Sequence, residues 1–291
     1  MANEITYNQT DGSFSTEYRL ARDSMLEALY ETAGSFMRHL WRKSLAGFHS
    51  TTERFTKKPK LAASAIADGV DMTNTPYTPS TVNLTVSEVG LTLTQTDLNA
   101  RFSLLDFREV GMEMGEAIAE KLLSDISSLG GGFSRSVGSS GNDLTEAQFL
   151  SARQTLRLLR MKEPYVAVLY PVQLDDLVQD SGTTLAPILY AGGPNVRSEA
   201  QDLTPRAGIE QGVMYRTEIY TPTTVPTANA GADSAGFMFS ARRAIAMVEG
   251  WATRLESERD ASLRATEMVG TSAYAVGEVD DDAGVGIITD R

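Results

Sequence analysis

The residues most often used in catalysis and metal binding are scarce in this sequence. The chain of 291 residues has no cysteine, and its two histidines are His39 and His49. The lack of cysteine excludes disulfides and thiolate metal sites, and two isolated histidines give little support to a zinc site. His39 lies near the end of a helical pattern and His49 in a polar stretch. We therefore expect both at the surface and neither as a general base.

The acidic residues are the next candidates for chemistry. Asp280, Asp281 and Asp282 could attract a divalent cation, but they lack the alternating spacing of a calcium loop. An Asp-Asp-Asp-Ala-Gly run between two apolar segments is typical of a turn. Glu113 and Glu116 have the spacing of charges on a solvated helix face. We therefore assign these carboxylates no metal and no acid or base role.

Motifs of common enzyme classes are absent from the sequence. It contains neither a G-x-x-x-x-G-K-[ST] phosphate loop nor a G-x-G-x-x-G fingerprint. Gly270 and Ser272 are followed by Tyr274, where a G-x-S-x-G nucleophile elbow needs a second glycine. The GGGF run at 130–133 is more simply explained as the end of a helix than as a phosphate cradle. The sequence therefore predicts no catalytic site, no metal site and no cofactor.

Charge is unevenly distributed along the chain. The formal net charge of −12 argues against a nucleic-acid-binding surface over the whole molecule, because that affinity comes mainly from Lys and Arg. Residues 38–60 are nevertheless rich in Lys and Arg, with Glu53 as their single acid, whereas residues 249–291 are rich in Asp and Glu. This asymmetry could steer one copy of the chain onto another, or both segments could simply be solvated faces.

Composition places the chain among globular proteins. Hydrophobic residues make up 42% of it, enough for an ordinary core in one large domain or two smaller ones. No apolar run approaches the roughly 20 residues of a membrane span, and the first residues lack a signal-peptide pattern.

The N-terminal region predicts a mobile arm followed by an amphipathic helix. About fifteen polar residues come first. From Glu17 to about Trp41 apolar residues then recur at helical spacing, at Leu26, Leu29, Tyr30, Ala33, Phe36, Met37, Leu40 and Trp41. This apolar face could belong to the core of the same chain or pack on a neighbouring copy.

Residues 51–97 predict an excursion that leaves the body of the protein and returns. Residues 51–80 have few large apolar side chains, and a loop of such length is usually functional or disordered. Residues 80–96 have the composition of a strand. Its apolar alternation changes parity around Ser87 and Glu88, which indicates a bulge or bend there.

A long helix is predicted at residues 104–129, with Ser103 and Asp106 as a capping pair and Gly130 to Gly132 ending it. Its apolar face predicts core positions at Phe107, Met114, Ile118, Leu122 and Ile126. A second helix at 145–161, a strand at 165–170 and a short helix around 174–178 follow.

The rest of the chain mixes loops and strands. Residues 179–206 are loop-like, and strand signals return at 213–220 and 237–239. Residues 244–248 could form a strand or a short helix, and two final strands are joined by DDDAG. Helices and strands are interleaved without a regular βα period, so the predicted class is α+β.

The ordered set of segments resembles the major capsid proteins of tailed bacteriophages over nearly the whole chain. The resemblance lies in the arm and its helix, the Lys-containing loop, and in VNLTVSEVGLTLTQTDLNARFSLLDFREVGMEMGEAIAEKLLSDI, YVAVLYPVQLDDL, GIEQGVMYRTEIYTPTTVP, GFMFSARRAIAMVEG and YAVGEVDDDAGVGIITD. It implies an N-terminal arm at 1–50, an extended β-hairpin loop and returning strand at 51–97, a peripheral domain with the spine helix at 98–162 and 249–279, and an axial domain at 163–248 and 280–291.

The resemblance also implies where subunits touch. In that family the arm and the extended loop reach over neighbouring subunits, so the expected contact residues are Leu26, Leu29, Tyr30, Phe36, Met37, Leu40, Trp41, Arg54, Lys57, Lys58 and Lys60. Some members cross-link a loop lysine to an asparagine of another subunit, but nothing here identifies such a partner.

The implied function is structural. Copies of the chain would form hexamers and pentamers of an icosahedral head shell around double-stranded DNA, assembled in the host bacterial cytoplasm and carried in the virion. A portal protein at one vertex and an optional decoration protein would be partners. Because the chain begins directly with the arm, we expect a separate scaffolding protein. The alternatives are an encapsulin-type compartment shell, and a monomeric hydrolase or ligand-binding protein that uses residues 179–206 as a lid.

Overall fold

The computed structural model describes residues 12–45, 50–59, 61–66, 68–69, 71, 74, 76–98, 107–180, 201–202 and 210–291, and of residues 12–18, 107, 201–202 and 210–211 it describes only the backbone. Several sequence predictions fall outside these residues. They are the arm before residue 12, His49, Lys60, the Ser103 and Asp106 caps, the Phe107 side chain, and most of the loop at 179–206.

The described elements are interleaved helices and strands, so the α+β class is confirmed. The helices are α1 (Gly12–Leu29), a π-helical turn (Tyr30–Gly34), α2 (Ser35–Met37), α4 (Phe107–Leu129) and α5 (Glu146–Leu158). Residues 171–180 are also helical, where the sequence predicted a short helix around 174–178. Short 3₁₀ turns lie at Gly130–Gly132, Asn229–Gly231 and Asp281–Ala283. The strands are β1 (Trp41–Ser44), β2 (Thr52–Lys57), β3 (Ser80–Thr85), β4 (Ser87–Thr96), β5 (Ser136–Val137), β6 (Tyr165–Val168), β7 (Gln201–Asp202), β8 (Glu210–Met214), β9 (Thr217–Tyr220), β10 (Thr227–Ala228), β11 (Asp233–Ser240), β12 (Ile245–Asp260), β13 (Ala265–Glu278) and β14 (Gly284–Asp290).

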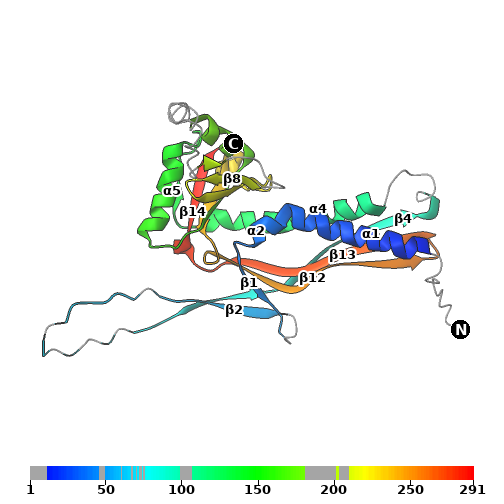
Figure 1. Ribbon diagram of the computed structural model, residues 1–291, viewed down its shortest axis with the longest axis horizontal. Coiled ribbons are helices and arrows are strands. Elements are labelled where there is room, and N and C mark those ends of the chain that lie inside the picture. The colour runs from blue at the N-terminus through cyan, green and yellow to red at the C-terminus, as the bar shows by residue number, and fades with distance from the viewer. Residues whose placement is uncertain are drawn as a thin grey trace.

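A long, narrow sheet forms one part of the molecule, with α1 and α4 running side by side along it (Figure 1). Its strand order is β1-β12-β13-β4, with β1 parallel to β12 and the other pairs antiparallel. Met25 of α1 and Met114 of α4 are buried against Leu255 and Met268 of the sheet. The amphipathic faces expected in both helices therefore cover one face of the same sheet.

The two helices approach so closely that α4 has glycine at the crossing. A Cβ atom added to Gly111 would lie 2.2 Å from the Ala21 carbonyl oxygen, and one added to Gly115 would lie 2.3 Å from that of Met25. The Ser24 hydroxyl, also at the crossing, donates to the Arg108 carbonyl at 3.1 Å. Because no larger residue fits between these backbones, the two glycines set the distance between the helices.

An eight-stranded sheet lies beside the C-terminal end of α4 (Figure 1). Its strand order is β5-β14-β11-β6-β9-β8-β7, and β10 pairs with β11. Every residue of β6 and β11 is buried. Helix α5 begins in a capping box, in which Thr145 and Gln148 each accept from the other's backbone N–H. It packs against β14 and β11. The ranges predicted for the two domains stay a prediction.

The β2–β3 hairpin projects away from both sheets (Figure 1). The predicted change of parity coincides with the break between β3 and β4 at Val86. Before the break, Val82 and Leu84 pack in a small cluster around Phe55. After it, Val89 and Leu91 pack against the main core. The chain therefore exchanges one apolar face for the other where it joins the four-stranded sheet.

The N-terminal helical segment ends earlier than the sequence predicted. Helical structure stops at Met37, and Trp41 begins strand β1. Leu40 is buried and Trp41 packs edge-on against Phe55 of the hairpin, with 5.0 Å between ring centroids. The prediction of a helix to Trp41 was wrong, because the backbone N–H and C=O groups from Trp41 onward pair with strand β12 instead of forming helical hydrogen bonds.

The three glycines after α4 form a 3₁₀ turn, as a helix stop requires. In the described part of the chain no helix is long and apolar enough to cross a membrane.

The glycine crossing gives a test of the fold. We expect Gly115→Ala to lower the free energy of unfolding by about 1–3 kcal/mol, because the new methyl group forces α1 away from α4. Gly131→Ala is the matched control, since a Cβ atom there meets nothing within 4 Å. Urea unfolding of both variants checks the prediction, and equal stabilities would contradict it.

Candidate functional site

The base of the projecting hairpin is held by a buried carboxylate. Lys57 Nζ lies 2.6 Å from Asp280 Oδ1, and Arg243 Nε donates to Asp280 Oδ2 at 2.8 Å. Asp280 is 2% exposed. Burial lowers the pKa of Lys57, but the hydrogen bond and charge of Asp280 outweigh this and raise it. Lys57 therefore stays charged and ties the hairpin to the connection between β13 and β14.

The other two aspartates of this connection also bind groups of their own chain. The backbone N–H of Ser134 donates to Asp281 at 2.8 Å, and Arg135 Nη1 lies 2.7 Å from Asp282. The run forms the turn that the sequence predicted, and it carries the chain from the four-stranded to the eight-stranded sheet. Among the described residues no group of acidic or histidine side chains is arranged to hold a metal.

The N-terminal residues expected at subunit contacts divide into two groups. Leu29, Phe36, Met37 and Leu40 are buried in the core of their own chain, which leaves no surface for a neighbour in this conformation. Leu26 and Trp41 are partly exposed, and Tyr30 is 60% exposed. A subunit contact at these three residues stays a prediction.

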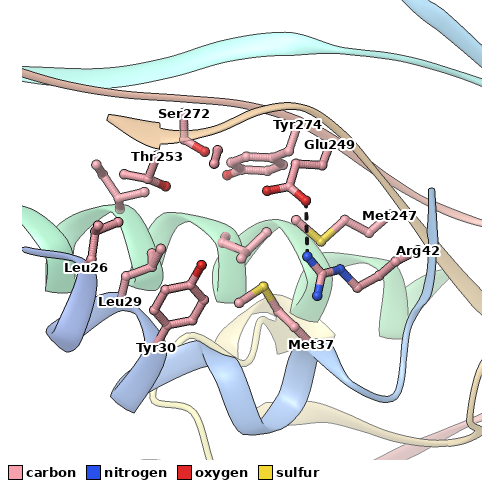
Figure 2. A pocket seen from close by; sticks show the side chains of 13 residues that line it. Leu26, Leu29, Tyr30, Met37, Arg42, Met247, Glu249, Thr253, Ser272 and Tyr274 are labelled. Carbon is pink, nitrogen blue, oxygen red and sulfur yellow. Dashed lines mark hydrogen bonds and ion pairs between the residues drawn. The ribbon is translucent and has the colours of Figure 1, made fainter. Parts of the chain in front are cut away.

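Tyr30 borders a small cavity between α1, α4 and the four-stranded sheet (Figure 2). Its volume is about 40 Å³, room for a few water molecules but far below that of a ligand pocket. Arg42 and Glu249 form an ion pair of 3.1 Å at its wall. The cavity is a packing gap, not a substrate site.

The expected core positions of the spine helix, Met114, Ile118, Leu122 and Ile126, are all buried. Val110, Ala119 and Leu123 are buried as well and were not among them. Their burial widens the apolar face, because α4 packs on α1 and on the sheet at once.

Of the hairpin residues expected at contacts, Arg54 is exposed and its Nη2 donates to Thr81 across the hairpin at 3.3 Å. Lys58 is exposed just beyond β2.

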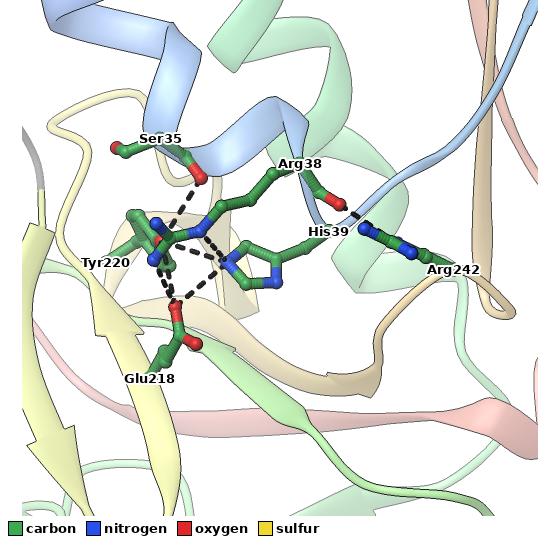
Figure 3. Close-up of polar contacts among 6 residues, drawn as sticks. All are labelled: Ser35, Arg38, His39, Glu218, Tyr220 and Arg242. Carbon is green, nitrogen blue, oxygen red and sulfur yellow. Dashed lines mark hydrogen bonds and ion pairs between the residues drawn. The ribbon is translucent and has the colours of Figure 1, made fainter.

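His39 is buried, so its predicted place at the surface was wrong. It is 5% exposed, and its Nε2 lies 2.9 Å from Glu218 Oε2 and 3.0 Å from the Tyr220 hydroxyl (Figure 3). Arg38 Nη2 also donates to Glu218, at 2.6 Å. This cluster joins the end of α2 to strand β9.

Tyr220 donates to the Ser35 carbonyl of α2 at 3.3 Å, which adds a second link between the two segments. The hydrogen bond with His39 lowers the pKa of Glu218 to about 2, with Arg38 adding to the shift and burial opposing it. Glu218 is therefore a carboxylate at all ordinary pH values. The members of the cluster bind one another across the two segments, as in a structural ion pair.

Comparisons with known proteins agree on the fold. No protein-family model matches the sequence, and comparison with curated protein sequences finds no relative. Among solved structures the chain is similar to the capsid of Ralstonia phage GP4, with a TM-score of 0.66, 11% identity, and coverage of 86% of this chain and 87% of that chain. It is also similar to the acid-stable capsid of Helicobacter pylori bacteriophage KHP30, with a TM-score of 0.65, 13% identity, and coverage of 87% and 88%.

A further similar structure is a virus-like particle from Pyrococcus furiosus, with a TM-score of 0.59, 11% identity, and coverage of 93% of this chain and 98% of that chain. The architecture is therefore that of viral and virus-like shell proteins. More particularly, the chain has the fold of the tailed-phage major capsid proteins.

The Glu218 cluster predicts a pH dependence of stability. Glu218 has a pKa of about 2 in the folded chain against an ordinary value of 4.5, so its stabilisation is present above pH 4.5 and is lost as the pH falls towards 2. We expect Glu218→Gln to cost about 1–3 kcal/mol at pH 7, with the difference shrinking below pH 4.5. Urea unfolding at several pH values measures it. A difference that does not change with pH would contradict the role of the charge, and Glu116→Gln, at an exposed position, is the control.

Proposed function

We propose that this chain is the major capsid protein of a tailed bacteriophage, a structural protein whose copies assemble into the icosahedral head shell around double-stranded DNA. The observation that carries the proposal is the extent of the structural similarity. The Ralstonia phage capsid protein is matched over 87% of its length by 86% of this chain. The similarity thus extends over the body and is not confined to a single domain.

The hairpin supports the proposal physically. Among the described strands, its two strands pair only with each other, so the sheet-edge groups of the hairpin have no partner strand in the described part of the chain. The segment beyond the strands exposes Leu61, Ile66 and Tyr77, at 63%, 51% and 50% of their surface. Apolar side chains on a projection away from the body are typical of a surface that a partner covers. In a shell that partner is a neighbouring subunit.

The polar groups of the described residues support a structural role as well. Buried or half-buried ionisable groups such as Asp280, His39 and Glu218 bind charged side chains of other segments. They hold the hairpin, the helices and the two sheets in fixed positions. A shell subunit needs this rigidity, because its shape sets the curvature of the shell.

The partners follow from this function. We propose that the subunits form hexamers and pentamers in the virion after assembly in the host cytoplasm. A portal, a scaffolding protein and a decoration protein stay predictions from the sequence.

A compartment shell of the encapsulin type is the second candidate. The similarity to the Pyrococcus particle, which covers 93% of this chain, favours it as a specific observation. The two candidates differ in what the shell encloses.

Assembly of the purified chain is the first test. We expect particles of megadalton mass with many identical copies, seen by sedimentation and negative-stain electron microscopy, either alone or with a scaffolding protein. Particles isolated from infected cells should contain nuclease-protected double-stranded DNA. A cargo enzyme in place of DNA would favour the compartment, and a strictly monomeric chain at high concentration would contradict both candidates.

The exposed apolar residues of the hairpin give a second prediction. We expect the triple change Leu61→Ser, Ile66→Ser and Tyr77→Ser to leave the thermal unfolding profile unchanged, since these side chains are exposed, but to reduce particle yield about tenfold or more. Leu158→Ser on α5, where the leucine is 74% exposed, is the control. Normal particle yield from the triple variant would show that the hairpin does not make the contact.

A further inference from the structure

An open groove lies where the base of the hairpin meets the turn between β11 and β12. Its volume is about 570 Å³. Trp41 and Val279 form part of its wall, and the charged side chains that line it are Lys57, Lys58, Lys162, Arg242, Arg243 and Asp280. A chain with a net charge of −12 therefore has a strongly cationic concave surface.

The cations of the groove differ in their partners. Lys57 and Arg243 both bind Asp280, the one carboxylate among the described residues that line the groove. Lys58 and Lys162 are exposed and form no ion pair with any described residue. Arg242 is also exposed, and its Nε donates only to the Arg38 carbonyl, at 3.3 Å. An excess of positive charge thus faces the solvent.

The spine helix has the complementary surface. Glu109, Glu113, Glu116 and Glu120 are exposed at helical spacing on α4, and no described cation pairs with them. At 1.5 Å per residue this acidic stripe is about 16 Å long. In Figure 1 α4 begins at the end of the molecule remote from the hairpin and runs back towards the eight-stranded sheet, so its first half lies away from the base of the hairpin. The stripe is therefore positioned for the groove of another copy and not for its own.

We propose that the cationic groove of one subunit binds the acidic stripe of α4 in a second copy of this chain. The inference rests on the proposed function, in which copies lie side by side in a shell. Charge complementarity of this kind orients subunits and excludes wrong pairings. It is also screened by salt, so the contact is strongest at low ionic strength.

Nucleic acid is the other polyanion that such a groove could bind, since Lys and Arg neutralise phosphates. The acidic stripe favours the second copy, because its four regularly spaced glutamates form no ion pair with a described cation and their charge complements that of the groove. The excess of acidic residues in the chain also opposes the approach of DNA.

Charge exchange tests the contact in the full-length chain. The groove variant carries Lys58→Glu and Lys162→Glu, and the stripe variant carries Glu113→Lys and Glu116→Lys; all four positions are exposed. Sedimentation velocity over a range of concentrations measures self-association. We expect each variant alone to need about a tenfold higher concentration than the unchanged chain to associate. A chain with all four changes, or an equal mixture of the two variants, should associate at nearly the original concentration.

The control is Arg157→Glu, an exposed charge reversal on α5 outside the groove, and thermal unfolding verifies that every variant folds. The inference would be overturned if the groove and stripe variants associated at the same concentration as the unchanged chain. It would also be overturned if the chain with all four substitutions did not regain association near the original concentration. Groove variants that lose affinity for duplex DNA while self-association is unchanged would overturn it as well, since the groove would then bind phosphate. If the unchanged chain associates only into small oligomers that respond to the exchange, the contact stands and the shell function fails. A strictly monomeric chain refutes both.

Discussion

The arrangement of the molecule depends on the burial of one charged group. Asp280 lies where the chain leaves the four-stranded sheet for the eight-stranded one. Its oxygens bind Lys57 of the hairpin and Arg243 of the turn before β12. Burying a carboxylate alone costs several kcal/mol, and two cations at hydrogen-bond distance offset that cost. Because the three residues come from three separate segments, this one charge fixes how the hairpin and the two sheets meet.

Features that depend on neighbouring residues could be predicted from the sequence. The change of parity near Ser87 predicted the break between β3 and β4, since strand alternation is a local property. The glycines after Leu129 predicted the end of α4, and the Asp-Asp-Asp-Ala-Gly run predicted the turn. Structures that share 11–13% identity with the chain over most of its length agree with this observation. The fold therefore depends mainly on where apolar, glycine and turn-forming residues lie along the chain, and less on the identity of each side chain.

Features that depend on distant residues could not be predicted. His39 has no local signal of burial, because the groups that bury and pair it, Glu218 and Tyr220, are about 180 positions away in the chain. Trp41 continued a helical pattern, but its strand partner Ala246 also comes from the far end. The cationic groove combines residues of the hairpin, Lys162 and the turn before β12. In the sequence these appear as unrelated charges, and only the folded chain places them on one surface.

The parallel pairing of β1 with β12 has a consequence for synthesis of the protein. Trp41 pairs with Ala246, so strand β1 has no partner until the ribosome has made nearly the whole chain. At roughly 5–20 residues per second the intervening segment takes on the order of 10–40 s to translate. During that interval the sheet edge of β1 lacks its partner, and α1 lacks the part of its cover that Leu255 and Met268 provide. A nascent subunit is thus exposed to aggregation for much of its translation, and folding is completed only as the last strands emerge.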